Sequence, residues 1–440
     1  MRWWSEHDGL HPKLAEEGLA AGALGGKKNG RHAICAQGFR GCMAPTIAQM
    51  ISATPISNRA SRTRPFHVMA LLARAAHREK THGPSIGMVV GEPDFPAPPQ
   101  VVAAAQEMLA KGKIHYTHAL GSEALREAIA QDYWERDQLS IPADRIAVTA
   151  GASAGLLLVM SAILNPGDEV LMADPSYPCN REFVASAGGS AVMIPVDATS
   201  QFQPTPEQVR EAWTPRTKAL LVASPANPTG TMLTEAQARA LLAVVRERGG
   251  VLIVDEIYQR IVFDGNERSL LSLGEDVISI NSFSKTYSMT GWRLGWVVAP
   301  PSLMGPLERL SQNLFISPSS LSQTAAIAAF SEASRQVADG YRDLFRRQRD
   351  FLLPALEGLG FEIPSQPQGA FYGYCDVSGL TPDSYAFCLA LCDAVGVLMT
   401  PGCDFGDYQA ARYLRVSYTK PISVLQEGVH RLETFLKGMQ

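Results

Sequence analysis

Between residues 145 and 250, short β-branched runs alternate with helical segments, for example the apolar helical pattern of Thr234 to Arg248. This alternation is what a mostly parallel sheet covered by helices requires. We therefore expect an α/β fold with a mostly parallel seven-stranded sheet between helices. The expected strands are Ile146 to Thr149, Glu169 to Ala173, Ala191 to Pro195, Ala219 to Ala223, Val251 to Val254, Val277 to Ile280 and Leu294 to Ala299.

The length of 440 residues exceeds the size at which a single core usually stops growing, so we expect two domains. Residues 91–325 are predicted to form the larger domain and residues 326–440, with mixed helices and short strands, a smaller α/β domain. Residues 56–90 hold a helical apolar pattern from Phe66 and a strand from Ile86 to Val90, and we expect them to join the smaller domain. Residues 1–55 show no sustained period and are predicted to be a disordered extension.

Charge, hydrophobicity and cysteine content argue against several classes of function. The net charge of −4 gives no global basic field that would favour nucleic acid or an anionic membrane. No apolar run approaches the ~20 residues that a membrane-spanning helix needs. The seven cysteines are odd in number and have no metal-ligand spacing, so we expect reduced thiols, no metal site and a cytoplasmic location.

One lysine stands between hydroxyl residues in the stretch from Ser282 to Arg293, which reads SFSKTYSMTGWR. We interpret Lys285 as a covalent, Schiff-base lysine, because burial can lower a lysine pKa enough to make its amine a nucleophile. Ser282, Ser284 and Arg293 would then hold a phosphate. The alternative is an ordinary solvated lysine, which is the commoner case for this residue type.

Further motifs follow the expected strands. The turn from Gly151 to Gly155 begins a helix, where free backbone N–H groups favour a phosphate. Tyr177 and Asn227 lie in proline-bounded loops, and Asp255 ends an apolar strand at the edge where open α/β sheets bind ligands. Each has a structural alternative: a packing tyrosine, a plain Asn-Pro turn and an unseen ion pair, respectively.

These five motifs and a sixth, the strand-like run YLRVSY from Tyr413 to Tyr418 that contains Arg415, resemble in their order class I aminotransferases, the fold type I enzymes of pyridoxal 5′-phosphate. The resemblance covers roughly residues 56 to 435. It implies that Lys285 carries the cofactor and that the ring contacts Tyr177 and Asp255. It also implies that Asn227 and Tyr258 bind the phenolic oxygen and that Gly91 and Arg415 bind the substrate carboxylate. The phosphate would be held by Ala152, Ser153, Ser282, Ser284, Arg293 and, from a neighbouring subunit of a homodimer, Tyr116.

The resemblance implies transfer of an amino group from an L-amino acid to a 2-oxo acid by a ping-pong mechanism. A β-eliminating lyase or a cyclopropane-forming synthase would keep the same cofactor residues. Both functions therefore stay open as alternatives. A transcription regulator of this fold would need a helix-turn-helix, and residues 1 to 55 show no such helix pair. We expect neutral donors to be favoured over aspartate, because residues 311–322 contain no basic residue and Ser153 stands where one branch has a lysine.

Overall fold

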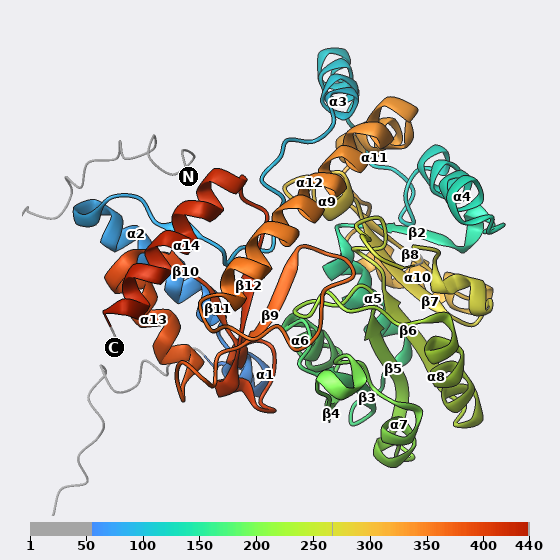
Figure 1. The fold of residues 1–440 in the computed structure, drawn as a ribbon. Helices are drawn as coiled ribbons and strands as arrows, with labels where there is room; N and C mark the ends of the chain where they lie inside the picture. Colours follow the sequence, from blue (N-terminus) through green and yellow to red (C-terminus); the bar gives the residue numbers. More distant parts are fainter. Residues whose placement is uncertain (1–54, 266, 439–440) are drawn as a thin grey trace, which may run out of the picture. The chain divides into compact units, whose positions relative to one another are not determined.

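The computed structural model describes residues 55–265 and 267–438, and residues 57–440 form one compact unit. The extension predicted for residues 1–55 lies almost wholly outside the described residues. In Figure 1 the unit contains a large sheet with helices and a second group of short strands and helices. Its helices include α1 (Asn58–Arg62), α7 (Pro206–Ala212), α13 (Ser384–Val395) and α14 (Ile422–Lys437).

The large sheet has seven strands in the order β2-β8-β7-β6-β5-β3-β4, and only β8 runs antiparallel to its neighbours. The prediction of a mostly parallel seven-stranded sheet is therefore confirmed. The strands are β2 (Ile146–Thr149), β3 (Glu169–Asp174), β4 (Ser190–Pro195), β5 (Thr217–Ala223), β6 (Val251–Asp255), β7 (Ile278–Ser282) and β8 (Gly295–Val298), each within two residues of its expected ends.

Both faces of this sheet are buried, because successive side chains along a strand point to opposite faces. In β5, Ala219 and Leu221 join one apolar cluster, whereas Leu220 and Val222 join another. One face is covered by α5 (Ala152–Ile163), α6 (Cys179–Ser186) and α10 (Pro301–Leu314). The other is covered chiefly by α3 (Pro99–Lys111), α4 (Glu123–Asp137), α8 (Glu235–Glu247) and α11 (Ser320–Ile327).

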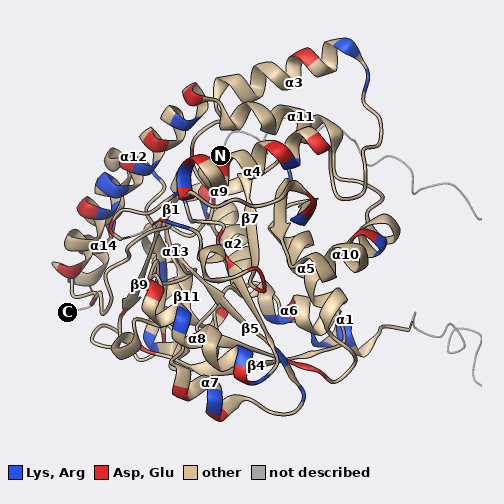
Figure 2. Ribbon diagram, turned by 90° about the vertical axis from the view of Figure 1, so that its right-hand side faces the viewer, with Lys and Arg blue, Asp and Glu red and all other residues tan. Residues whose placement is uncertain are grey.

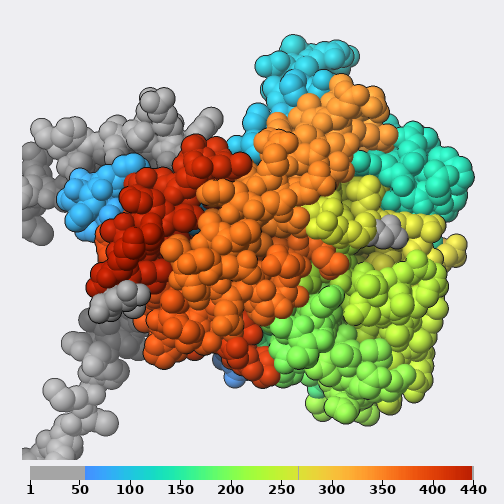
Figure 3. All heavy atoms as spheres, viewed as in Figure 1, coloured from blue at the N-terminus to red at the C-terminus, as the bar shows by residue number. Residues whose placement is uncertain are grey.

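A third apolar cluster surrounds a three-stranded sheet in the order β11-β12-β9, formed by β11 (Thr400–Pro401), β12 (Tyr413–Ser417) and β9 (Tyr372–Asp376). Helix α12 (Glu332–Glu357) contacts both α14 and α3, and Figure 3 shows it in orange across this face of the molecule. Arginine and acidic residues alternate along α12 in Figure 2, as expected for a solvated face. The domain boundaries expected after residues 90 and 325 stay predictions.

The N-terminal segment packs beside the third cluster. Helix α2 (His67–His82) contacts α13, and β1 (Ile86–Gly87) pairs in parallel with β10 (Val397–Leu398). The strand expected from Ile86 to Val90 is thus wrong in length. It stops early because the carbonyl oxygen of Val89 accepts side-chain hydrogen bonds from Arg415 and Thr400 instead of pairing with a strand.

Helix α10 does not continue into α11. It ends at Leu314, and Pro318, which has no N–H to continue a helical ladder, separates it from α11. Across the described residues, none of the helices combines the length and apolarity needed to cross a bilayer.

Candidate active site

A cavity of about 340 Å³ lies where the carboxyl ends of the large sheet meet the third cluster and α2. Strands β3, β5, β6 and β7 all run in one direction, so the loops that follow them open at one edge of the sheet. The sequence-predicted residues that line the cavity are Gly91, Ala152, Ser153, Tyr177, Asn227, Asp255, Tyr258, Ser282, Ser284, Lys285, Arg293 and Arg415.

Tyr116 is the one predicted site residue that the structure leaves away from this cavity. Its side chain is 81% exposed, in the connection between α3 and α4. It is not among the residues that line the cavity. The expected contact of Tyr116 with a neighbouring subunit stays a prediction.

Lys285 lies in the short helix α9 (Phe283–Thr286), which begins directly after β7. Its Nζ donates a 2.6 Å hydrogen bond to the carbonyl oxygen of Gly91. Burial lowers the pKa of Lys285 to about 8, and Glu92 opposes this shift whereas the cations Arg415 and Arg293 add to it. A substantial fraction of the amine is therefore neutral near pH 8, as a nucleophile requires.

A phosphate cradle lies at the N-terminus of α5. Gly151 precedes the helix with φ +81°, and a Cβ at this position would lie 2.6 Å from Nη2 of Arg293. Only glycine lets the guanidinium come this close to the backbone. One corner of the cavity is thus surrounded by free N–H groups of the first helical turn, the hydroxyls of Ser282 and Ser284 and the cation of Arg293. This donor set fits a phosphate dianion.

Asp255 ends β6 and is buried, with 4% of its surface exposed. Its carboxylate accepts one 3.2 Å hydrogen bond from the backbone N–H of Ile257, and no ion pair to it occurs among the described residues. Burial raises the pKa of Asp255 to about 7. A protonated pyridine nitrogen would supply the cation that this carboxylate lacks, so Asp255 also fits the cofactor.

Arg415 comes from β12 and lies 6% exposed against the opposite wall. Its Nη1 donates to Oδ1 of Asn227 at 2.8 Å and its Nη2 to the carbonyl oxygen of Val89 at 2.8 Å. The guanidinium carbon lies 4.3 Å from the ring centroid of Tyr372. Its Nε is buried without a hydrogen-bond partner. A buried cation with an unused donor suits capture of a carboxylate.

Two tyrosines join the sheet edge to the small sheet. The hydroxyls of Tyr258 and Tyr372 lie 2.8 Å apart. A Cβ at Gly91 would lie 2.3 Å from the Tyr372 hydroxyl, so glycine is required there by close packing. Tyr372 is therefore a direct neighbour of two predicted site residues, Gly91 and Tyr258.

The sequence did not identify the apolar wall that α2 contributes through Phe66, Val68, Met69 and Leu72. It also missed Asp404, whose carboxylate accepts hydrogen bonds from the backbone N–H groups of His67 (2.9 Å) and Val68 (3.0 Å). Asp404 therefore caps α2, whose own N-cap residue provides no side-chain hydrogen bond. Pro401 and Gly402 precede Asp404 in the chain, and this Pro-Gly turn is the local sequence signal at that position.

The sheet order, the lysine after β7 and the acid after β6 together define a fold type I transferase. The chain belongs to the family Aminotransferase class I and II, whose match covers residues 84–432. It is a pyridoxal-phosphate-dependent aminotransferase, as the sequence motifs predicted.

Relatives support this assignment over nearly their full lengths. The chain is 37% identical over 374 residues to the valine–pyruvate aminotransferase of Mycobacterium tuberculosis, covering 84% of this chain and 96% of the relative. It is 34% identical to the aspartate/prephenate aminotransferase of Thermus thermophilus, covering 87% and 98%. A crystal structure of an aminotransferase from Mycobacterium tuberculosis superposes with a TM-score of 0.84, at 36% identity, and covers 88% of this chain and 100% of that chain.

Proposed function

We propose that this chain binds pyridoxal 5′-phosphate in the cavity and moves the amino group of a neutral L-amino acid to a 2-oxo acid in a ping-pong cycle. The observation that carries the proposal is the environment of Lys285, a lysine with a lowered pKa beside a buried, unpaired Asp255. These two groups and a phosphate cradle in one cavity are what a pyridoxal-phosphate enzyme needs, and the half-reaction test separates transamination from β-elimination.

The proposed cofactor contacts follow from the donor set. Ala152, Ser153, Ser282, Ser284 and Arg293 would hold the phosphate. Tyr177 would lie against the ring, and Asp255 would pair with its protonated nitrogen. Asn227 and Tyr258 would donate to the phenolic oxygen. When bound, pyridoxal phosphate supplies an aldehyde that bonds to amines and a ring that withdraws electrons from the donor's Cα.

Lys285 would have two roles. Its neutral amine holds the cofactor covalently, and once displaced by the donor amine it takes the proton from the donor's Cα as a general base. Arg415 would hold the donor α-carboxylate so that this Cα–H bond lies within reach of Nζ. Water would then release the keto acid while the donor's amino group stays at the cofactor, and a second 2-oxo acid would take up that amino group by the reverse steps.

The far wall of the cavity supports a neutral donor. Phe66, Val68, Met69 and Leu72 of α2 line it. Within the described part of the chain, the basic lining residues are Lys285, Arg293 and Arg415, each of which has a proposed role already. A second carboxylate, as in aspartate, would lack a cation and would cost several kcal/mol to bury. The two relatives are named for different donors, valine and aspartate, so their names do not decide the question.

The test is a half-reaction with one amino acid and no acceptor. Alanine, valine, leucine, phenylalanine, aspartate and glutamate are each added to the holoenzyme while cofactor absorbance and keto acid are measured. Transamination predicts stoichiometric keto acid and accumulation of the amino form of the cofactor, fastest with the neutral donors. A β-eliminating lyase would form neither keto acid nor the amino form of the cofactor from these donors, because none of them carries a leaving group on Cβ. A clear preference for aspartate would contradict the donor assignment.

We also propose a homodimer. Tyr116 is 81% exposed, and Ile114, Leu314 and Ile316 nearby are 44%, 53% and 56% exposed. The two segments lie together because the backbone N–H of Thr117 donates to Oγ of Ser317. An exposed apolar patch of this kind fits an interface between copies. The free cysteines, Cys179, Cys375, Cys388, Cys392 and Cys403, suit the reducing cytoplasm, where we propose that the dimer acts.

Subunit complementation tests the shared site. Chains carrying Lys285→Ala and Tyr116→Phe are each impaired when alone. In a mixed dimer, one site would receive both an intact Lys285 and an intact Tyr116, so mixing should restore activity. No gain on mixing, or a monomer in light scattering, would contradict the proposal.

A further inference from the structure

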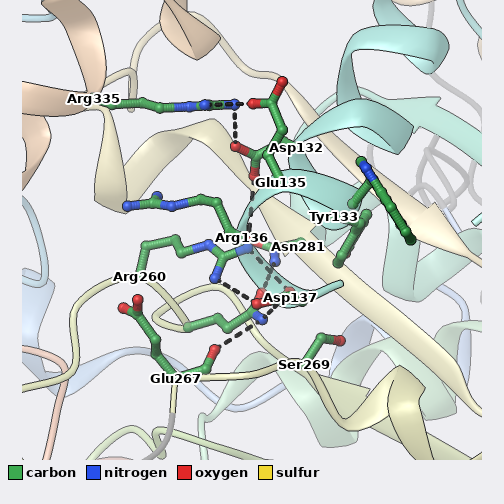
Figure 4. Close-up of polar contacts among 12 residues, drawn as sticks. Asp132, Tyr133, Glu135, Arg136, Asp137, Arg260, Glu267, Ser269, Asn281 and Arg335 are labelled. Atoms are coloured by element: carbon green, nitrogen blue, oxygen red, sulfur yellow. Dashed lines mark hydrogen bonds and ion pairs between the residues drawn. The ribbon is translucent and has the colours of Figure 1, made fainter. Parts of the chain in front are cut away.

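A buried ion cluster lies behind the site and contributes no side chain to the cavity. It consists of Asp132 and Asp137 on α4, Arg260 after β6, and Arg335 on α12. Nη1 and Nη2 of Arg260 donate to the two carboxylate oxygens of Asp137 at 2.9 and 3.0 Å, and Nη2 of Arg335 donates to Asp132 at 2.9 Å. Figure 4 shows these pairs, with Asn281 beside Asp137.

Gln259 connects this cluster to β7, the strand that leads into the helix carrying Lys285. Its Nε2 donates to Oδ2 of Asp137 and to the carbonyl oxygen of Glu267, both at 3.1 Å. Its Oε1 accepts a 3.2 Å hydrogen bond from Nδ2 of Asn281. Oδ1 of Asn281 in turn accepts the backbone N–H of Ser282 at 2.8 Å. Gln259 and Asn281 are 4% and 6% exposed, so water does not compete for these bonds.

This connection lies where the sheet no longer holds the two strands together. The last paired residues of β6 and β7 are Asp255 and Ile280. Beyond this pair, one chain continues to Tyr258 and the other to Ser282 and Lys285. The backbone N–H of Glu256 still donates to the carbonyl oxygen of Ile280 at 2.8 Å, and beyond this bond the Gln259–Asn281 side-chain bond links the two segments.

The cofactor would have to contact both segments at once, with its ring against the β6 side and its phosphate and covalent bond on the β7 side. A relative shift of about 1 Å between such groups can cost on the order of 10²-fold in rate. Supporting hydrogen bonds of this kind orient the groups that contact a ligand, and their loss typically costs ~10- to 100-fold in metal-site affinity or activity.

We propose that Gln259 is a positioning residue that fixes the Tyr258 segment relative to the Ser282–Lys285 segment, using Asp137 of the buried ion cluster as its anchor. The inference rests on the proposed cofactor site. It assigns to Asp137 a role in ligand binding in addition to stability, because the amide that Asp137 anchors joins the two halves of the cradle.

Pyridoxamine 5′-phosphate is the probe, because it has no aldehyde and its affinity reports the cradle without the covalent bond. Its Kd and the melting temperature are measured for the apo full chain, for Gln259→Met and for Arg335→Met. Methionine keeps the volume of Gln259 and removes its hydrogen bonds. Arg335→Met is the matched control, because it breaks the same cluster on the side away from Gln259 and Asn281.

Gln259→Met should raise the Kd about 10-fold or more, whereas Arg335→Met should change it less than about 2-fold while lowering the melting temperature at least as much. Equal Kd values for both variants, with only the melting temperatures reduced, would overturn the inference. If Gln259→Met does not fold, Gln259→Glu replaces it. That variant keeps the oxygen that accepts from Asn281, loses the donor to Asp137, and should also weaken binding. Failure of the unsubstituted chain to bind the probe would contradict the proposed cofactor site instead.

Discussion

Arg415 donates a 2.8 Å hydrogen bond to the side-chain carbonyl oxygen of Asn227, 188 residues earlier in the chain. Strand β12 supplies the arginine and the loop after β5 supplies the amide, so the bond joins the small sheet to the edge of the large one. The group proposed to hold the substrate carboxylate thus contacts a group proposed to hold the cofactor. Substrate and cofactor positions should therefore depend on each other.

Arg415→Lys should raise the KM for amino donors ~10- to 100-fold, because a charged hydrogen bond contributes roughly 1.5–3 kcal/mol and an ammonium cannot donate in a bidentate fork. The Kd for the cofactor should change much less. Steady-state kinetics and cofactor titration check the two values. Arg412→Lys is the control, since Arg412 pairs with Asp376 outside the cavity. An unchanged KM in Arg415→Lys would remove Arg415 from the substrate site.

Lys285→Ala should lower turnover by at least ~10²-fold, because the variant loses both the covalent attachment and the general base. The cofactor should still bind noncovalently through Asp255, Ser282 and Arg293. Absorbance spectra give the loss of the covalent bond, and a donor–acceptor assay gives the turnover. Substantial transamination by this variant would assign the chemistry to another residue.

The pH dependence of cofactor capture follows from the pKa of Lys285. Burial lowers this pKa to about 8 from its ordinary 10.5, so the neutral amine is already abundant above pH 8. The rate at which the apo chain bonds to pyridoxal phosphate should rise ~10-fold per pH unit below pH 8 and level off above it. Stopped-flow absorbance measures the profile. A rate that still rises steeply from pH 9 to 10 would indicate an ordinary lysine.

Glu92→Gln provides a second check on this profile. Glu92 raises the pKa of Lys285, in opposition to burial. Its neutralisation should therefore move the midpoint of the profile to lower pH. A shift to higher pH would contradict the electrostatic contribution.

Asp404→Ala should lower stability by about 0.5–2 kcal/mol, the usual contribution of a helix N-cap. It should also raise the KM for leucine more than the KM for alanine, because the capped first turn of α2 carries Val68 and Met69 into the cavity wall. Denaturant unfolding and kinetics with both donors measure these effects. Asp407→Ala is the control, since its side chain forms an exposed pair with Arg64. Equal changes for the two donors would show that the cap has no part in donor selection.

The sequence by itself determined the large sheet and the residues at its carboxyl edge. Period and composition are local, and parallel strands must end at a common edge, so the motifs after β2, β3, β5, β6 and β7 had to converge. For this reason Lys285, Asp255 and Asn227, which are far apart in the chain, could be placed in one site before the structure was known.

Only the tertiary structure decided which segments close and support that site. The contact between Asp404 and the first turn of α2 spans 337 residues, and the Gln259–Asn281 link depends on how two strands separate beyond their last pair. Neither leaves a periodic signal in the sequence, because each depends on a single polar side chain meeting a distant partner. The same reason explains why Tyr372 becomes a neighbour of Tyr258 only when the small sheet packs against the large one.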